Sequence, residues 1–139
     1  KNLFLIVANT YGIELLEDNV LKCRKRIFKI VSEIYLKKFQ SNSNSKFIKS
    51  LNFVISKNIV HGDSLTNKNP SNGEYLKFSE WVFTTRSLVK RRDFLYKELI
   101  ENSIINDSPL FAINESQVFI PDPHKDFNAI HFYELASHV

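Results

Sequence analysis

Apolar residues recur at helical spacing along two stretches of the first half of the chain. From about Glu17, apolar residues fall every three or four positions, and lysines and arginines occupy the other side, as in an amphipathic helix. The apolar positions are Val20, Cys23, Ile27, Ile30, Val31, Ile34 and Tyr35. The stretch "KFIKSLNFVISK" repeats this spacing. We therefore expect two helices, separated by a loop at "QSNSNS".

Short apolar runs flank these two helices. "YGIEL" predicts a short buried strand, and "NIVHGD" predicts a strand that stops at Gly62. "KNLFLIVANT" is too short and too uniformly apolar to assign, and fits either a strand or the last turns of a helix. The order strand, helices, strand leaves enough residues for a crossover, so the two strands are expected to be parallel in a βαβ unit.

The second half of the chain has the pattern of antiparallel strands. "YLKFSEWVF" and "SLVKRRDFLY" predict a hairpin around "TTR", and "KELIENSII" predicts a short helix. "PLFAINESQVFIPDP" predicts a second hairpin, and "KDFNAIHFYELA" fits a strand or a helical turn. The predicted fold class is α/β, with a βαβ unit over residues 1–67 and a β-rich extension of the same domain over residues 68–139.

Composition agrees with a folded chain and excludes some classes of protein. The 139 residues are 43% apolar and 24% charged, which is typical of a globular domain. No apolar run approaches the roughly 20 residues of a membrane span, so we expect a soluble, cytoplasmic protein without a membrane partner. The single cysteine, Cys23, excludes an intramolecular disulfide and is expected to be a packed thiol. The net charge of +4 is weak evidence for a nucleic-acid partner.

Two strands are expected to end on carboxylates at the same edge of the sheet. Glu14 follows the first strand and Asp63 the second, and ligands of open α/β sheets bind beyond the carboxyl ends of strands. One carboxylate there can accept hydrogen bonds from both hydroxyls of a ribose, and the other from the exocyclic amine of an adenine. The alternative is structural: Glu14, Glu17 and Asp18 cap the start of a helix, and Asp63 is a turn residue after Gly62.

Four segments in order resemble the central part of one enzyme family. "YGIELLEDNVLKCRKRIFKI", "KNIVHGDSLT", "FSEW" and "VKRRDF" are similar to segments of S-adenosylmethionine-dependent DNA adenine-N6 methyltransferases of restriction-modification systems. The resemblance implies a partial Rossmann-like core, S-adenosylmethionine as the cofactor and DNA as a partner. It also implies that Glu14 holds the cofactor ribose, Leu15 packs on the adenine face and Asp63 accepts from the adenine amine, with Ser64 beside it.

Two motifs of that family are absent. The only glycines are Gly12, Gly62 and Gly73, so no glycine-rich loop follows a first strand, and "NKNPSNGE" is not an Asn-Pro-Pro-aromatic motif. We expect no methyl transfer by this chain as it stands. Because it starts at Lys1 and contains no methionine, we expect a fragment or subunit of such a methyltransferase. The alternative is a non-catalytic module that pairs with the rest of the enzyme or with another restriction-modification subunit.

The densest basic cluster is Lys90, Arg91 and Arg92, with Phe94 and Tyr96 nearby. These residues fit a phosphate contact to DNA with an adjacent stacking ring, or a solvated strand face with its aromatic residues in the core. In an extended strand, Lys90 and Arg92 project to one side and Arg91 to the other.

The remaining chemistry-bearing residues indicate no second site. Trp81, between two phenylalanines, is expected in the core. The four histidines have no common zinc spacing, and no nucleophile elbow or phosphate-binding loop is present, so no metal site or serine hydrolase is predicted.

Overall fold

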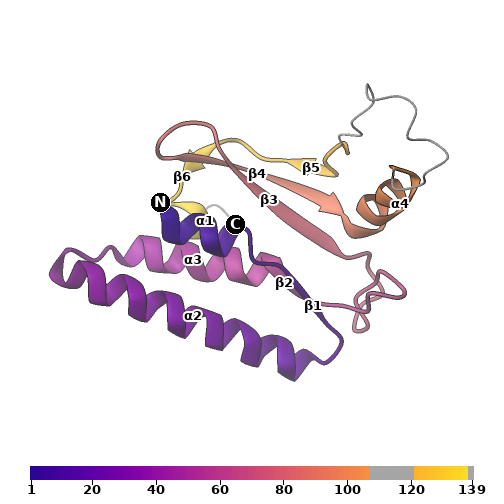
Figure 1. The fold of residues 1–139 in the computed structure, drawn as a ribbon, viewed down its shortest axis with the longest axis horizontal. Coiled ribbons are helices and arrows are strands. Elements are labelled where there is room, and N and C mark those ends of the chain that lie inside the picture. The colour runs from indigo at the N-terminus through magenta and orange to yellow at the C-terminus, as the bar shows by residue number, and fades with distance from the viewer. Residues whose placement is uncertain (107–120, 138–139) are drawn as a thin grey trace.

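The computed structural model describes residues 1–106 and 121–137, and it describes side chains over residues 1–101 and 121–137. The chain is a mixed α/β protein with one parallel pair of strands and a separate antiparallel sheet. Figure 1 shows α3 between α2 and the antiparallel sheet, with α1 beside it. The first elements are α1 (Asn2–Ala8), β1 (Gly12–Glu14), α2 (Glu17–Phe39), η1 (Gln40–Asn42), α3 (Ser45–Asn58) and β2 (Ile59–His61).

The βαβ unit is confirmed. β1 pairs in parallel with β2, and the register places Glu14 opposite His61. The stretch "QSNSNS" is only partly a loop, because a short 3-10 helix, η1, precedes Asn44. Asn44 then caps α3, because its side-chain oxygen accepts the N–H groups of Lys46 and Phe47. The amino-terminal run, which the pattern left open, forms the helix α1.

Burial differs from expectation in β1 and on one side of α2. All three residues of β1 are half-buried rather than buried. On α2, Val20, Val31 and Tyr35 are buried, whereas Ile30 and Ile34 are 58% and 52% exposed. The physical reason is that α3 and β2 cover only part of the apolar side of α2, and β1 has a strand on one edge alone.

The second half forms the expected antiparallel hairpin and adds two short strands to it. β3 pairs with β4 through a register that includes Trp81 opposite Arg91, and β4 also pairs with β5 and β6. The predicted short helix is α4, which follows β4 directly. Most of the second predicted hairpin, residues 109–120, lies outside the described residues. The bounds are β3 (Lys77–Phe83), β4 (Leu88–Leu95), α4 (Tyr96–Asn106), β5 (Lys125–Asp126), β6 (Ile130–His131) and η2 (Leu135–Ser137).

One hydrophobic core joins the helices to the antiparallel sheet. Phe4 of α1 and Leu51 of α3 are fully buried and share a cluster with Trp81 of β3 and Val89 of β4. The expectation that Trp81 lies in the core is confirmed. Among the described residues, no helix is both long enough and apolar enough to cross a membrane.

Candidate functional site

The carboxyl ends of β1 and β2 bring the two predicted acids to one edge of the parallel pair. Glu14 is the last residue of β1, and its carbonyl accepts the N–H of Gly62 at 3.0 Å. Asp63 follows Gly62 directly, so both acids leave their strands at the same end. Both residues are half-buried. The alternation along the strands and their parallel direction produce this placement.

Each carboxylate uses one oxygen to hold the local backbone. Glu14 Oε1 accepts the N–H of Leu16, the residue that caps α2, at 3.0 Å. Asp63 Oδ1 accepts the N–H of Leu65 at 2.8 Å, in a turn. The turn role of Asp63 is therefore present. The capping role is not, because α2 has no side-chain cap hydrogen bond: Glu14 accepts only the N–H of the N-cap residue Leu16, and Glu17 and Asp18 lie in the first turn of the helix. Within the described part of the chain, the second oxygen of each carboxylate has no hydrogen-bond partner, so each can still accept from a ligand.

The neighbours of these acids fix the edge and leave an apolar surface beside it. His61 Nε2 lies 2.9 Å from the carbonyl oxygen of Leu15, so that nitrogen donates its proton and ties β2 to the end of β1. The Leu15 side chain is 54% exposed, and Ser64 is also exposed. Gly62 is buried against Leu76, where an added Cβ would lie 2.5 Å from Leu76 Cδ1. The sequence pattern alone did not indicate His61 as a member of this site.

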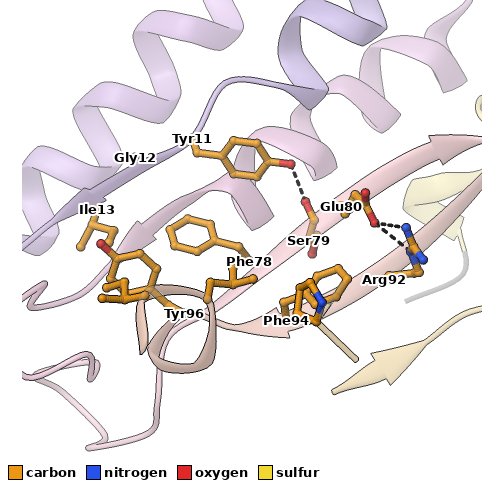
Figure 2. Close-up of a pocket in the computed structure, with 12 residues that line it drawn as sticks. Tyr11, Gly12, Ile13, Phe78, Ser79, Glu80, Arg92, Phe94 and Tyr96 are labelled. Carbon is orange, nitrogen blue, oxygen red and sulfur yellow. Dashed lines mark hydrogen bonds and ion pairs between the residues drawn. The ribbon is translucent and has the colours of Figure 1, made fainter. Parts of the chain in front are cut away.

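A large apolar cavity lies along the other edge of β1 and does not include either acid (Figure 2). It has a volume of about 650 Å³ and is lined from β1, β3, β4 and α4. Tyr11, Phe78 and Tyr96 form one wall, with successive edge-to-face ring contacts at 5.6 and 5.4 Å. Figure 2 shows the Tyr11 hydroxyl directed at Ser79, whose carbonyl oxygen accepts its proton at 2.9 Å.

Two further features of this cavity concern charge and backbone. Burial, and then the nearby Glu80 carboxylate, raise the pKa of Tyr11. Glu80 forms an ion pair with Arg92 across the hairpin at 2.5 Å.

On the β1 side, β2 is the only strand that pairs with β1 among the described residues. Because Glu14 directs its carbonyl at β2, the alternation of the ladder points the N–H and C=O of Ile13 away from β2.

The basic cluster on β4 is paired with carboxylates inside the chain. Arg91 lies on the side of the sheet that faces Trp81 and Phe127, with its guanidinium 4.4 Å from the Phe127 ring centroid. Lys90 and Arg92 have register partners on β3 at Val82 and Glu80. The carboxylate partners are Asp126 for Lys90 at 2.8 Å, Asp93 for Arg91 at 2.7 Å and Glu80 for Arg92 at 2.5 Å. A role of these cations in DNA binding stays a prediction, and any DNA phosphate has to compete with these partners.

Comparisons with protein families, with curated proteins and with solved structures find no match to this chain. The function proposed below therefore rests on the resemblance of the four sequence segments and on the arrangement of the residues.

Proposed function

We propose that this chain is a fragment or subunit of a DNA adenine-N6 methyltransferase and supplies half of the pocket for S-adenosylmethionine. The observation that carries this proposal is the placement of Glu14 and Asp63. They lie at one edge of a parallel strand pair that two helices connect, and each keeps one carboxylate oxygen without a partner in the described chain. Such an edge is where open α/β sheets bind nucleotide-like ligands.

The proposed roles follow from hydrogen-bonding capacity. An ionised carboxylate only accepts hydrogen bonds, so the two hydroxyls of a ribose can donate to Glu14 and the exocyclic amine of adenine to Asp63. The exposed Leu15 side chain offers an apolar face for the adenine ring, and Ser64 lies beside Asp63. When bound, the cofactor supplies the methyl group. The chain's own contribution is to bind and orient the adenosine part, because the Asn-Pro-Pro-aromatic motif is absent from the sequence.

The parallel pair of strands is only partly covered by the rest of the chain, which supports the proposal that the chain is part of a larger assembly. Parallel sheets are almost always covered on both faces and contain several strands, whereas a two-stranded sheet is marginal on its own. Here β1 is half-buried, and Ile30 and Ile34 on α2 are exposed. A neighbouring element from the rest of the enzyme would cover these groups.

Adenosine is the sharpest probe, because it contains the ribose and adenine and lacks the methionine and any phosphate. We expect millimolar binding, about −4 kcal/mol, from half of a pocket. In two-dimensional NMR of the labelled chain, adenosine should shift the amide signals of Glu14, Leu15, Gly62 and Asp63. Glu14→Gln should weaken binding about tenfold, because a hydrogen bond to a charged acceptor is lost.

The variants are chosen to preserve the backbone contacts. The amide oxygen of Glu14→Gln can still accept from Leu16, and that of Asp63→Asn from Leu65, so both variants should fold. Glu33→Gln, an exposed change of the same charge on α2, is the matched control and should bind adenosine as the unaltered chain does. Absence of any shift at the carboxylate edge, or equal affinity for all variants, would refute the proposal.

A second candidate is a non-catalytic module that pairs with another chain. The observation in its favour is the outward N–H and C=O of Ile13, which lie beside an apolar cavity at a strand edge, where an added strand can pair. Ile13→Pro removes that outward N–H and is compatible with an edge position. A complex with a second chain that Glu14→Gln preserves and Ile13→Pro abolishes, together with no adenosine binding, would favour this candidate.

A further inference from the structure

A polar cavity of about 460 Å³, separate from the apolar one, lies among α2, the end of α3, β2 and the hairpin. Its half-buried wall contains three cations, one from each of three elements: Arg24 of α2, Lys57 of α3 and Arg91 of β4. The one carboxylate among them is the buried Asp93. The other acids that line the cavity, Glu17 and Glu74, are exposed.

The hydrogen bonds leave two of these cations without a counter-ion. Arg91 binds Asp93 in a bidentate manner, with Nε to Oδ1 at 2.8 Å and Nη2 to Oδ2 at 2.7 Å, and Ser79 Oγ also donates to Oδ1 at 2.7 Å. Asp93 therefore accepts three hydrogen bonds, two at Oδ1 and one at Oδ2, and its charge is paired with that of Arg91. Neither Arg24 nor Lys57 pairs with a carboxylate within the described residues. Charges that are removed from water are normally paired. Because Arg24 and Lys57 have no such partner in the described chain, this half-buried wall carries a net positive charge.

Arg24 and Lys57 are held in place by other contacts. Arg24 Nε and Nη2 donate to the carbonyl of Ile59 at 2.9 and 2.6 Å, and Nη2 also donates to the carbonyl of Ser56 at 3.0 Å. These hydrogen bonds compensate the partial negative charge of the carbonyl groups at the end of α3. They leave Nη1 of Arg24 without a partner in the described chain. Lys57 Nζ lies 5.3 Å from the ring centroid of Phe53. The Arg24 guanidinium is thus oriented before any ligand arrives, whereas the Lys57 ammonium makes only the ring contact.

The neighbouring charges disfavour the charged form of Lys57. Burial lowers the pKa of Lys57 most, and the Arg91 guanidinium lowers it further; Asp93 opposes this, and Arg24 adds a smaller lowering effect. Burial also lowers the pKa of Arg24. An anion between these groups would remove the repulsion and favour the charged form of Lys57.

We propose that this cavity binds one phosphate group. Two guanidinium groups and an ammonium group that converge from three elements suit a tetrahedral oxyanion with several acceptor oxygens. Asn69, Ser71 and Asn72 also line the cavity and provide further polar groups. The group is either free phosphate or a phosphate of a nucleic-acid backbone. The cavity shares His61 with the carboxylate edge, but the two proposals are tested separately, because adenosine has no phosphate.

Calorimetry and NMR of the whole chain test the site with two probes, inorganic phosphate and a short DNA duplex, at constant ionic strength. Binding of phosphate should shift the amide signals of Lys57, Asn69 and Ser71, and Lys57→Gln should weaken it about tenfold, for one charge-assisted hydrogen bond. Lys29→Gln, on the exposed side of α2, makes the same change of net charge and should leave the affinity unaltered. If Lys57→Gln weakens the binding of the DNA duplex as well, the phosphate belongs to nucleic acid. If it weakens the binding of inorganic phosphate alone, the ligand is free phosphate.

A second measurement does not depend on a variant. In the unaltered chain, NMR titration of the Lys57 side chain should give a pKa below the ordinary lysine value, and phosphate should raise that pKa. Neither probe binding, a pKa that phosphate does not change, or equal effects of Lys57→Gln and Lys29→Gln would overturn the proposal.

Discussion

Asn58 is the polar residue on which the packing of the helices against the hairpin depends most directly. It is fully buried at the end of α3. Its amide nitrogen donates to the carbonyls of Val7 and Ala8 at 3.3 and 3.1 Å, and its amide oxygen accepts the indole N–H of Trp81 at 2.9 Å. We therefore predict that Asn58→Ala strongly destabilises the fold.

The size of the effect follows from what the substitution leaves unpaired. The Val7 carbonyl also accepts the N–H of Thr10, so it keeps a partner. The Ala8 carbonyl and the Trp81 indole N–H would lose their described partner. Both residues are buried, with exposed fractions of 2% for Ala8 and 6% for Trp81. Each such group costs about 1–3 kcal/mol, so the loss of both partners should lower the free energy of unfolding by about 2–6 kcal/mol. Asn52→Ala, at an exposed position of the same helix, should change it by no more than about 0.5 kcal/mol.

Equilibrium urea unfolding measures this difference. With an m-value of about 2 kcal/mol/M, Asn58→Ala should lower the midpoint by roughly 1–3 M. The fluorescence of Trp81, the only tryptophan, and far-UV circular dichroism should report the same transition in a two-state protein. A midpoint for Asn58→Ala equal to that of Asn52→Ala would refute the role assigned to these three hydrogen bonds.

Three other predictions follow from particular contacts. Gly62→Ala should lower the free energy of unfolding by about 1–3 kcal/mol in the same assay, because its Cβ would overlap the buried Leu76 side chain. The pKa of Tyr11 is raised in the folded chain, so its contribution to stability is complete below the unfolded pKa of about 10 and is lost as pH rises through the higher folded pKa. Unfolding experiments at several pH values should show that Tyr11→Phe abolishes this loss of stability at alkaline pH. If the methyltransferase contacts DNA phosphates through Lys90 and Arg92, replacing both by Ala should lower the salt slope of DNA binding by roughly 1–2 units for cognate and unrelated duplexes alike, whereas an unchanged slope would exclude them.

Local patterns were sufficient for α2, α3, the parallel pair and the β3–β4 hairpin, and for the placement of the two acids, whereas they left α1 unassigned. The spacing of apolar residues specified α2 and α3, and the chain length between the short strands specified their parallel pairing. Glu14 and Asp63 reach the same edge because parallel strands end together. These features depend on residues close in sequence, and on one rule of chain connection.

Features that depend on packing between residues far apart in the sequence could not be predicted from local patterns. The exposure of Ile30 and Ile34 follows from how little of α2 the rest of the chain covers. The carboxylate partners of the basic cluster come from register, because Lys90 pairs with an acid on β5 that is distant in sequence. Likewise, the polar cavity unites Arg24 and Lys57, which appeared in the sequence only as polar positions on two separate helices.

The central claim is that Glu14 binds the adenosine part of a methyltransferase cofactor. The most direct test is transfer of a labelled methyl group from S-adenosylmethionine to the N6 atom of adenine in duplex DNA by the complete enzyme that contains this chain, whether as one longer polypeptide or as a complex of subunits. We predict transfer by that enzyme, at least about a tenfold loss of kcat/KM for Glu14→Gln, and no transfer by the 139-residue chain alone. Transfer by the chain alone, no transfer by the complete enzyme, or transfer that Glu14→Gln leaves unchanged would contradict this role of Glu14.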